Sequence, residues 1–218
     1  METGKFKLLI FDLDGTLIDS QKDLADSVNY VLSCYGKPSV DTVTLRSYIG
    51  NGVVSLMERA LPFFKGEQLH EAVAVFREHY GQHLLDTTRP YGGIEELLKS
   101  SPGVKKAVLT NKPEIFSKKI LEGLNLSDCF SLIWGGDTGR SKKPSPEPVL
   151  EIIKSLGADL PETILIGDGI NDILAAKAAK ILSGAVGYGY TDAKELALLK
   201  PDYFFRIPAD LMLLIENK

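Results

Sequence analysis

Residues 7–16 read KLLIFDLDGT, an apolar run that ends in two carboxylates two positions apart. The run contains no alternation of polar and apolar residues, which is typical of a strand buried on both faces of a parallel sheet. Gly15, after the second carboxylate, permits a sharp turn. We therefore predict a buried strand over residues 7–11 whose tip carries Asp12 and Asp14.

Further short apolar runs of the same kind occur along the chain. They span residues 104–109, 132–134, 163–166, 182–186 and 203–205. The first three are each followed by a helical pattern, and the last two are interpreted as outer strands. This alternation of strands and helices predicts an α/β fold with a doubly wound parallel sheet of the Rossmann-like kind.

Between about residues 20 and 85 the strand-like runs disappear and helical periodicity takes over. The apolar residues that share a helical face are Leu24, Val28, Val31 and Leu32 in one predicted helix and Val73, Phe76, Tyr80 and Leu84 in another. We predict that residues 17–85 form a helical cap domain. It would be inserted into an α/β catalytic core made of residues 1–16 and 86–218.

Composition excludes several classes of function. The chain has 218 residues, a net charge of −4 and acids scattered among its bases, so it lacks the basic face that nucleic-acid binding requires. No apolar run approaches the roughly 18 to 20 residues of a membrane helix. Cys34 and Cys129 show no metal-ligand spacing and are interpreted as buried free thiols. We expect a soluble, cytoplasmic protein, either a monomer or a homodimer, that binds neither nucleic acid nor membrane.

Polar residues follow the apolar runs in four places. In an open α/β sheet, ligands bind beyond the carboxyl ends of the strands, so these residues are candidates for one site. The four sets are residues 12–16 (DLDGT), 110–112 (TNK), 142–144 (KKP) and 167–172 (GDGIND). They offer carboxylates for a hard cation such as Mg²⁺, a hydroxyl group for phosphate oxygens and a lysine to balance negative charge. These are the groups that phosphoryl transfer requires.

The four sets, in this order, resemble the haloacid dehalogenase superfamily of phosphatases over nearly the whole chain. The resemblance implies that Asp12 is the nucleophile and forms an aspartyl phosphate. It implies that Asp14 is the general acid and base, and that the backbone carbonyl of Asp14 also contacts magnesium. Thr110 would hold phosphate and Lys143 would balance charge. Lys143 is preferred to Lys142 for this role because it directly precedes Pro144.

The last set supplies the rest of the implied metal site. Asp168 would be a magnesium ligand together with Asp12 and Asp14. Asp172 would lie behind the ligands and orient either a ligand water or Lys143. The form GDGIND is more often met in other branches of the superfamily, so this set departs from the subfamily that the other segments resemble.

Within the superfamily, the segments YIGNG (48–52), TNKP (110–113), GGD (135–137) and KPSP (143–146) look most like phosphoglycolate phosphatases. This resemblance implies a small phosphorylated metabolite as the substrate, most simply 2-phosphoglycolate. Phosphoglycolate carries a carboxylate as well as a phosphate. Candidates to bind the substrate are Asn111 in the core and Arg46, Gly50, Asn51 and Gly52 in the cap.

Other functions remain open from the sequence. A sugar-phosphate mutase, a pyrophosphatase and a nucleotide phosphatase can be built on the same scaffold. A receiver-type signalling switch also uses a phosphorylated Asp, a Thr, a Lys and magnesium on a parallel sheet. A receiver needs a long-lived phosphoryl group and no lid, whereas this chain has Asp14 placed to activate water and a long helical insert. The sequence therefore favours the enzyme.

Overall fold

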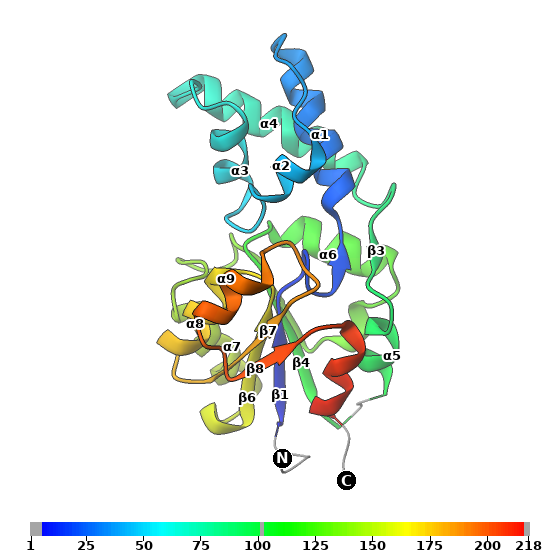
Figure 1. The fold of residues 1–218 in the computed structure, drawn as a ribbon, viewed down its shortest axis with the longest axis vertical. Helices are drawn as coiled ribbons and strands as arrows, with labels where there is room; N and C mark the ends of the chain where they lie inside the picture. Colours follow the sequence, from blue (N-terminus) through cyan, green and yellow to red (C-terminus); the bar gives the residue numbers. More distant parts are fainter. Residues whose placement is uncertain (1–5, 101–102, 216–218) are drawn as a thin grey trace.

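The computed structural model describes residues 6–100 and 103–215, so residues 1–5, 101–102 and 216–218 of the predicted core lie outside the described residues. A parallel sheet has the strand order β5-β4-β1-β6-β7-β8 (Figure 1). Its strands are β1 (Leu8–Phe11), β4 (Lys105–Leu109), β5 (Leu132–Trp134), β6 (Thr163–Gly167), β7 (Leu182–Val186) and β8 (Tyr203–Phe205). The predicted fold class is confirmed, and each predicted strand is present to within one residue at either end.

Strand β1 is buried on both faces, as its unbroken apolar sequence predicts. Its four residues are all 0% exposed. Successive side chains of a strand point to opposite faces. Accordingly, Leu9 and Phe11 belong to one apolar cluster and Leu8 and Ile10 to another. The central position of β1 therefore fixes the place of Asp12, which follows it directly.

Helices cover both faces of the sheet. The first cluster includes apolar residues of α5 (Ile94–Lys99), α6 (Glu114–Gly123) and the 3₁₀ helix η3 (Pro208–Leu214), whereas the second includes those of α7 (Glu147–Leu156) and α8 (Ile170–Ala178). The remaining elements of this part are α9 (Ala193–Leu198) and the short 3₁₀ helices η1 (Ser127–Cys129) and η2 (Leu160–Glu162). No helix within residues 6–100 and 103–215 is long and apolar enough to cross a membrane.

The segment predicted to be helical folds into α1 (Gln21–Cys34), α2 (Thr42–Arg46), α3 (Val53–Ala60) and α4 (Gly66–Gln82), called here the helical insert. Figure 1 shows these helices together beyond the carboxyl end of β1. The predicted apolar faces are confirmed, because all eight of the predicted residues are buried, although Leu84 lies just beyond the end of α4. The prediction for Cys34 is wrong: its side chain is exposed, and Cys129 is half-buried.

Two short strands join the helical insert to the sheet. They are β2 (Ile18–Asp19) and β3 (Arg89–Pro90), which pair in antiparallel fashion. The sequence indicates only linkers here, because a two-residue strand is too short to show an alternating pattern. The paired strands bring both connections of the insert side by side.

A buried carboxylate in α1 binds the second of these connections. Asp23 is 1% exposed and accepts hydrogen bonds from the backbone N–H and the hydroxyl group of both Thr87 and Thr88, at 2.5 to 3.1 Å. Burial alone would raise the pKa of Asp23, but these hydrogen bonds outweigh it, so the pKa lies below its ordinary value of 3.8. The folded state is therefore stabilised by the ionised form.

Asp23→Asn should lower the free energy of unfolding by about 2 to 3 kcal/mol, because an amide NH₂ group would face N–H and O–H donors. The lowered pKa means that the stabilisation is present at neutral pH and is lost as the pH falls through the folded-state pKa. Urea unfolding of both proteins should therefore give a difference that is largest near neutral pH and shrinks in acid. The exposed Asp26→Asn is the matched control. A difference that does not change with pH would contradict this account of Asp23.

Candidate functional site

The four polar sets meet at the carboxyl edge of the sheet. Asp12 follows β1, Thr110 follows β4 and Asp168 follows β6, and these three strands are adjacent and parallel. Their tips must therefore lie side by side. Lys143 reaches the same place from the segment before α7, since its Nζ donates a hydrogen bond to the carbonyl of Leu109 at 2.7 Å.

Three buried carboxylates lie together, and two of them contact one ammonium group. Oxygen atoms of Asp12, Asp168 and Asp172 lie within 4.8 Å of one another. Lys143 Nζ lies 2.8 Å from Asp12 Oδ1 and 2.5 Å from Asp172 Oδ1. Burial by itself would lower the pKa of Lys143, but the two carboxylates raise it above its ordinary value, so the amine is protonated. Lys142, by contrast, donates to the carbonyl of Asn51 at the rim.

Asp168 is held rigidly within this cluster. It accepts hydrogen bonds from Thr16 Oγ1 at 3.0 Å and from the backbone N–H of Tyr190 at 2.7 Å. Gly15 and Gly189 allow the chain to pass close by, since a Cβ atom at either position would lie within 2.3 Å of an Asp168 atom. Burial, with the charges of the other two carboxylates, raises the pKa of Asp168 to about 8.

The acidic cluster fits a metal ion. With all three carboxylates ionised and Lys143 protonated, the cluster carries two net negative charges, which a divalent cation would balance. Burial, and then the charges of Asp12 and Asp172, raise the pKa of Asp168, so a bound cation would favour its ionised form. Asp12 Oδ1 is buried and accepts no well-formed hydrogen bond from the described residues, although Lys143 Nζ is near. Oxygen ligands of this kind suit a hard cation. The cluster could therefore hold a divalent metal.

The side chain of Asp14 lies outside the acidic cluster, in an ion pair that the sequence did not reveal. Lys112 Nζ donates to both carboxylate oxygens of Asp14, at 2.7 and 2.8 Å, and Ser20 Oγ donates to Oδ1 at 2.5 Å. Burial would lower the pKa of Lys112, but Asp14 and Tyr80 together raise it above its ordinary value. Lys112 belongs to a set that the sequence singled out, yet a lysine beside a helix start resembles an ordinary surface charge.

Thr110 and Asn111 occupy the loop between β4 and α6. The backbone N–H of Thr110 donates to the carbonyl of Trp134 at 3.0 Å, and the Thr110 side chain lines a cavity with Asp12. Asn111 Nδ2 donates to the carbonyls of Gly50, at 2.9 Å, and Lys143, at 3.1 Å. Asn111 thus links the helical insert to the loop that carries Lys143.

The glycine-rich loop of the insert lies against the core. Gly50 and Gly52 have φ values of 107° and 85°, which favour glycine. Between them, Asn51 Oδ1 accepts a hydrogen bond from Asn171 Nδ2 at 2.7 Å. The three predicted residues are therefore brought to the site, where Gly50 and Asn51 form hydrogen bonds with the core and Gly52 lines a cavity.

Arg46 is also brought to the site, and it contacts backbone carbonyls there. Its Nε donates to the carbonyl of Tyr190 at 3.1 Å, and its Nη2 donates to the carbonyl of Gly189. The guanidinium carbon lies 5.7 Å from the centre of the Tyr190 ring. Arg46 thereby joins α2 to the loop that holds Asp168. Nothing in the sequence indicated Tyr190 as its partner.

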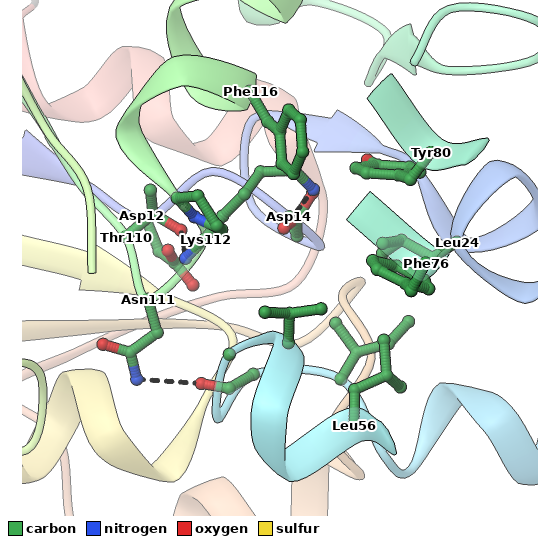
Figure 2. Close-up of a pocket in the computed structure, with 15 residues that line it drawn as sticks. Asp12, Asp14, Leu24, Leu56, Phe76, Tyr80, Thr110, Asn111, Lys112 and Phe116 are labelled. Carbon is green, nitrogen blue, oxygen red and sulfur yellow. Dashed lines mark hydrogen bonds and ion pairs between the residues drawn. The ribbon is translucent and has the colours of Figure 1, made fainter. Parts of the chain in front are cut away.

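Two cavities adjoin at Asp12 and Asp14. The larger, about 500 Å³, contains the acidic cluster, Lys143 and Arg46. The smaller, about 50 Å³, lies under the helical insert and contains Thr110 and Lys112 in its wall. Figure 2 shows Lys112 extending toward Asp14, with Phe116 and Tyr80 near the pair. A reactant bound at Asp12 could therefore place one end among charged groups and the other in a small, largely apolar space.

Comparison with known proteins gives consistent matches. The family model described as haloacid dehalogenase-like hydrolase matches residues 9–186. A phosphoglycolate phosphatase of Colwellia psychrerythraea is 38% identical over 226 residues, with all of both chains covered, and one of Aquifex aeolicus is 41% identical over 213 residues, with 97% of each covered. The crystal structure of a predicted phosphoglycolate phosphatase from Haemophilus somnus has a TM-score of 0.92 and 31% identity, covering 97% of this chain and 99% of that one.

Proposed function

Because the chain belongs to the haloacid dehalogenase-like hydrolase family and is a phosphatase, we propose that it is a magnesium-dependent hydrolase of 2-phosphoglycolate. One observation carries the proposal. Asp12 belongs to a buried acidic cluster suited to a divalent cation, and it also lines a small cavity that contains a buried lysine. A short molecule with a phosphate at one end and a carboxylate at the other matches this arrangement.

In the proposed first step, a carboxylate oxygen of Asp12 attacks phosphorus and the bond from phosphorus to the leaving oxygen breaks, which gives an aspartyl phosphate. Magnesium, held by Asp12, Asp168 and the backbone carbonyl of Asp14, would supply positive charge that reduces the repulsion between the two anions. Lys143 balances charge on the phosphoryl oxygens and on Asp12, and Thr110 donates a hydrogen bond to the phosphoryl group.

Asp14 serves both halves of the proposed reaction. In its protonated form it first gives its proton to the leaving oxygen. The carboxylate that results then takes a proton from the water that attacks the aspartyl phosphate, which restores the protonated form. The bond between phosphorus and the Asp12 oxygen breaks in that second step, and inorganic phosphate is released. Asp172 orients Lys143 through their 2.5 Å contact and bonds neither substrate nor product.

We further propose that residues 17–85 act as a cap over the core formed by residues 1–16 and 86–218. The paired strands β2 and β3 would be its hinge, and the contacts of Asn111 and Arg46 with the opposite part would form on closure. Closure would exclude water while the aspartyl phosphate forms. Gly50, Asn51 and Gly52 would complete the substrate site in that state. A cytoplasmic location and a monomeric or homodimeric state remain predictions from the sequence.

A phosphate-release assay tests the proposed function. The enzyme, with magnesium, should release phosphate over many turnovers from 2-phosphoglycolate, and faster than from sugar phosphates, nucleotides or pyrophosphate. Removal of divalent metal by a chelator should stop the release. A single stoichiometric burst without turnover would instead support a phosphorylated signalling switch, and a clear preference for another phosphate compound would contradict phosphoglycolate as the substrate.

Asp168→Asn should raise the magnesium concentration needed for half-maximal activity by about 10- to 100-fold, because an amide oxygen is a weaker ligand than a carboxylate. A magnesium titration of the initial rate checks this. Asp192→Asn, which lines the larger cavity but does not belong to the acidic cluster, is the control and should leave the titration unchanged. An unchanged titration in Asp168→Asn would remove Asp168 from the proposed ligands.

A further inference from the structure

The smaller cavity has the dimensions of a short organic acid. A water molecule needs roughly 10 to 15 Å³ of space measured in this way, so about 50 Å³ accommodates only a few non-hydrogen atoms. Apolar side chains form much of the wall, among them those of Leu24, Leu56, Phe76 and Phe116 (Figure 2). A two-carbon tail attached to a phosphate at Asp12 would extend into this space, whereas a sugar or a nucleoside would exceed it.

Lys112 supplies the only basic side chain among the described residues that line this cavity. It is 6% exposed, and its Nζ lies 4.9 Å from the centre of the Tyr80 ring. An ammonium group has three hydrogen atoms to donate, and Lys112 donates hydrogen bonds to the two carboxylate oxygens of Asp14. A buried cation in an apolar wall needs an anionic partner, which is Asp14 in this structure. A substrate carboxylate in this cavity would compete with Asp14 for the same ammonium group.

The larger cavity offers a poorer place for a second anion. Asp12 and Asp14 line both cavities. The larger one adds the basic side chains of Arg46, Arg59 and Lys143, but also four more acidic ones, those of Asp168, Asp172, Asp192 and Glu195. Two nitrogen atoms of Arg46 already donate to backbone carbonyls. The carboxylates of this cavity would repel an anionic tail unless a bound cation lay between them. The distribution of charge therefore favours the smaller cavity for the carboxylate end of the substrate.

We propose that Lys112 determines specificity by binding the substrate carboxylate, and that this binding releases Asp14 from its ion pair. The proposal rests on the proposed function, because it takes the phosphate to lie at Asp12. Two carboxylates then compete for one ammonium group. Asp14 keeps the hydrogen bond from Ser20 and is free to turn toward the leaving oxygen. A phosphomonoester with an uncharged tail leaves the pair between Lys112 and Asp14 intact.

A binding measurement tests this without catalysis. Isothermal titration should show that the wild-type enzyme with magnesium binds 3-phosphonopropionate more tightly than propylphosphonate, which has the same length but no carboxylate. Lys112→Met should reduce this preference by about 10- to 100-fold, and Lys112→Arg should retain part of it. Lys119→Met, which removes an exposed charge from α6, the helix that follows Lys112, is the control. A preference that survives in Lys112→Met, or that is lost only in Arg46→Ala, would overturn the proposal.

Lys112→Met leaves the Asp14 carboxylate without its partner, which can destabilise the fold. A second pair of variants separates an effect on folding from an effect on binding. In Asp14→Asn the competing carboxylate is absent, and this variant should bind 3-phosphonopropionate more tightly than the wild type. Adding Lys112→Met to it should abolish the preference over propylphosphonate, with no unpaired carboxylate left at position 14. Equal preferences in the single and double variants would overturn the role of Lys112.

Kinetics separate this proposal from the proposed function. The wild type should hydrolyse phosphoglycolate with a higher kcat and a lower KM than ethyl phosphate, because the carboxylate both binds and releases Asp14. Lys112→Met should lose most of this advantage in both constants. Loss of activity to the same degree on both substrates would overturn the proposal while leaving a phosphatase. A wild-type enzyme that releases phosphate from neither would overturn the proposed function, and the titrations would still decide the role of Lys112.

Discussion

Asp12→Asn is expected to lower the turnover of phosphoglycolate by at least about 10⁴-fold, because an amide keeps the shape of the side chain but cannot attack phosphorus. The variant should remain folded. Replacing one of three crowded carboxylates by a neutral group reduces their repulsion, and Lys143 keeps its contact with Asp172. Initial rates and a thermal unfolding curve would measure both properties.

The control for this variant is the exposed Asp26→Asn, which should retain the wild-type rate. Turnover close to the wild-type value in Asp12→Asn would contradict the assignment of the nucleophile. A large loss of stability would contradict the account of the acidic cluster, because it would mean that the Asp12 carboxylate stabilises the fold more than it crowds its neighbours.

Lys143→Met should lower both activity and stability. Its ammonium group is the one that contacts Asp12 and Asp172, so its removal leaves buried carboxylates uncompensated, at a cost of about 3 to 5 kcal/mol. We expect turnover to fall by about 10²- to 10⁴-fold, because charge on the phosphoryl oxygens is no longer balanced. Magnesium should restore part of the lost stability. Thermal unfolding with and without magnesium, together with initial rates, provides the measurement.

Lys142→Met is the matched control, because Lys142 is the neighbouring residue and lies at the rim. It should change the free energy of unfolding much less. If Lys142→Met abolished turnover and Lys143→Met did not, the choice between the two lysines would be wrong.

The sequence predicts the sheet well because its strands are buried on both faces. Apolar runs bounded by polar turns identify each strand, and the carboxyl ends of parallel strands necessarily gather Asp12, Thr110 and Asp168. These predictions depend on short segments and on one topological rule. The short strands β2 and β3 could not be found in this way, since two residues carry no periodicity.

The contacts that the sequence did not reveal are long-range and specific. Lys112 and Asp14 are far apart in the chain, and each on its own resembles a residue with a different role. The bonds from Thr87 and Thr88 to Asp23 likewise depend on where the second connection of the insert lies. Arg46 was predicted to bind substrate, and the structure adds its bonds to the carbonyls of Gly189 and Tyr190. Such pairings follow from packing, which local patterns do not encode.

The central claim is that phosphate passes through Asp12, and trapping it there tests this most directly. In Asp14→Asn, acetyl phosphate still offers a good leaving group with a two-carbon tail, whereas no group remains to activate water for the second step. We predict a burst of acetate that approaches one equivalent per enzyme, and a mass increase of one phosphoryl group located by peptide mapping at Asp12. Steady hydrolysis at the wild-type rate, with no phosphoryl group on Asp12, would contradict the account.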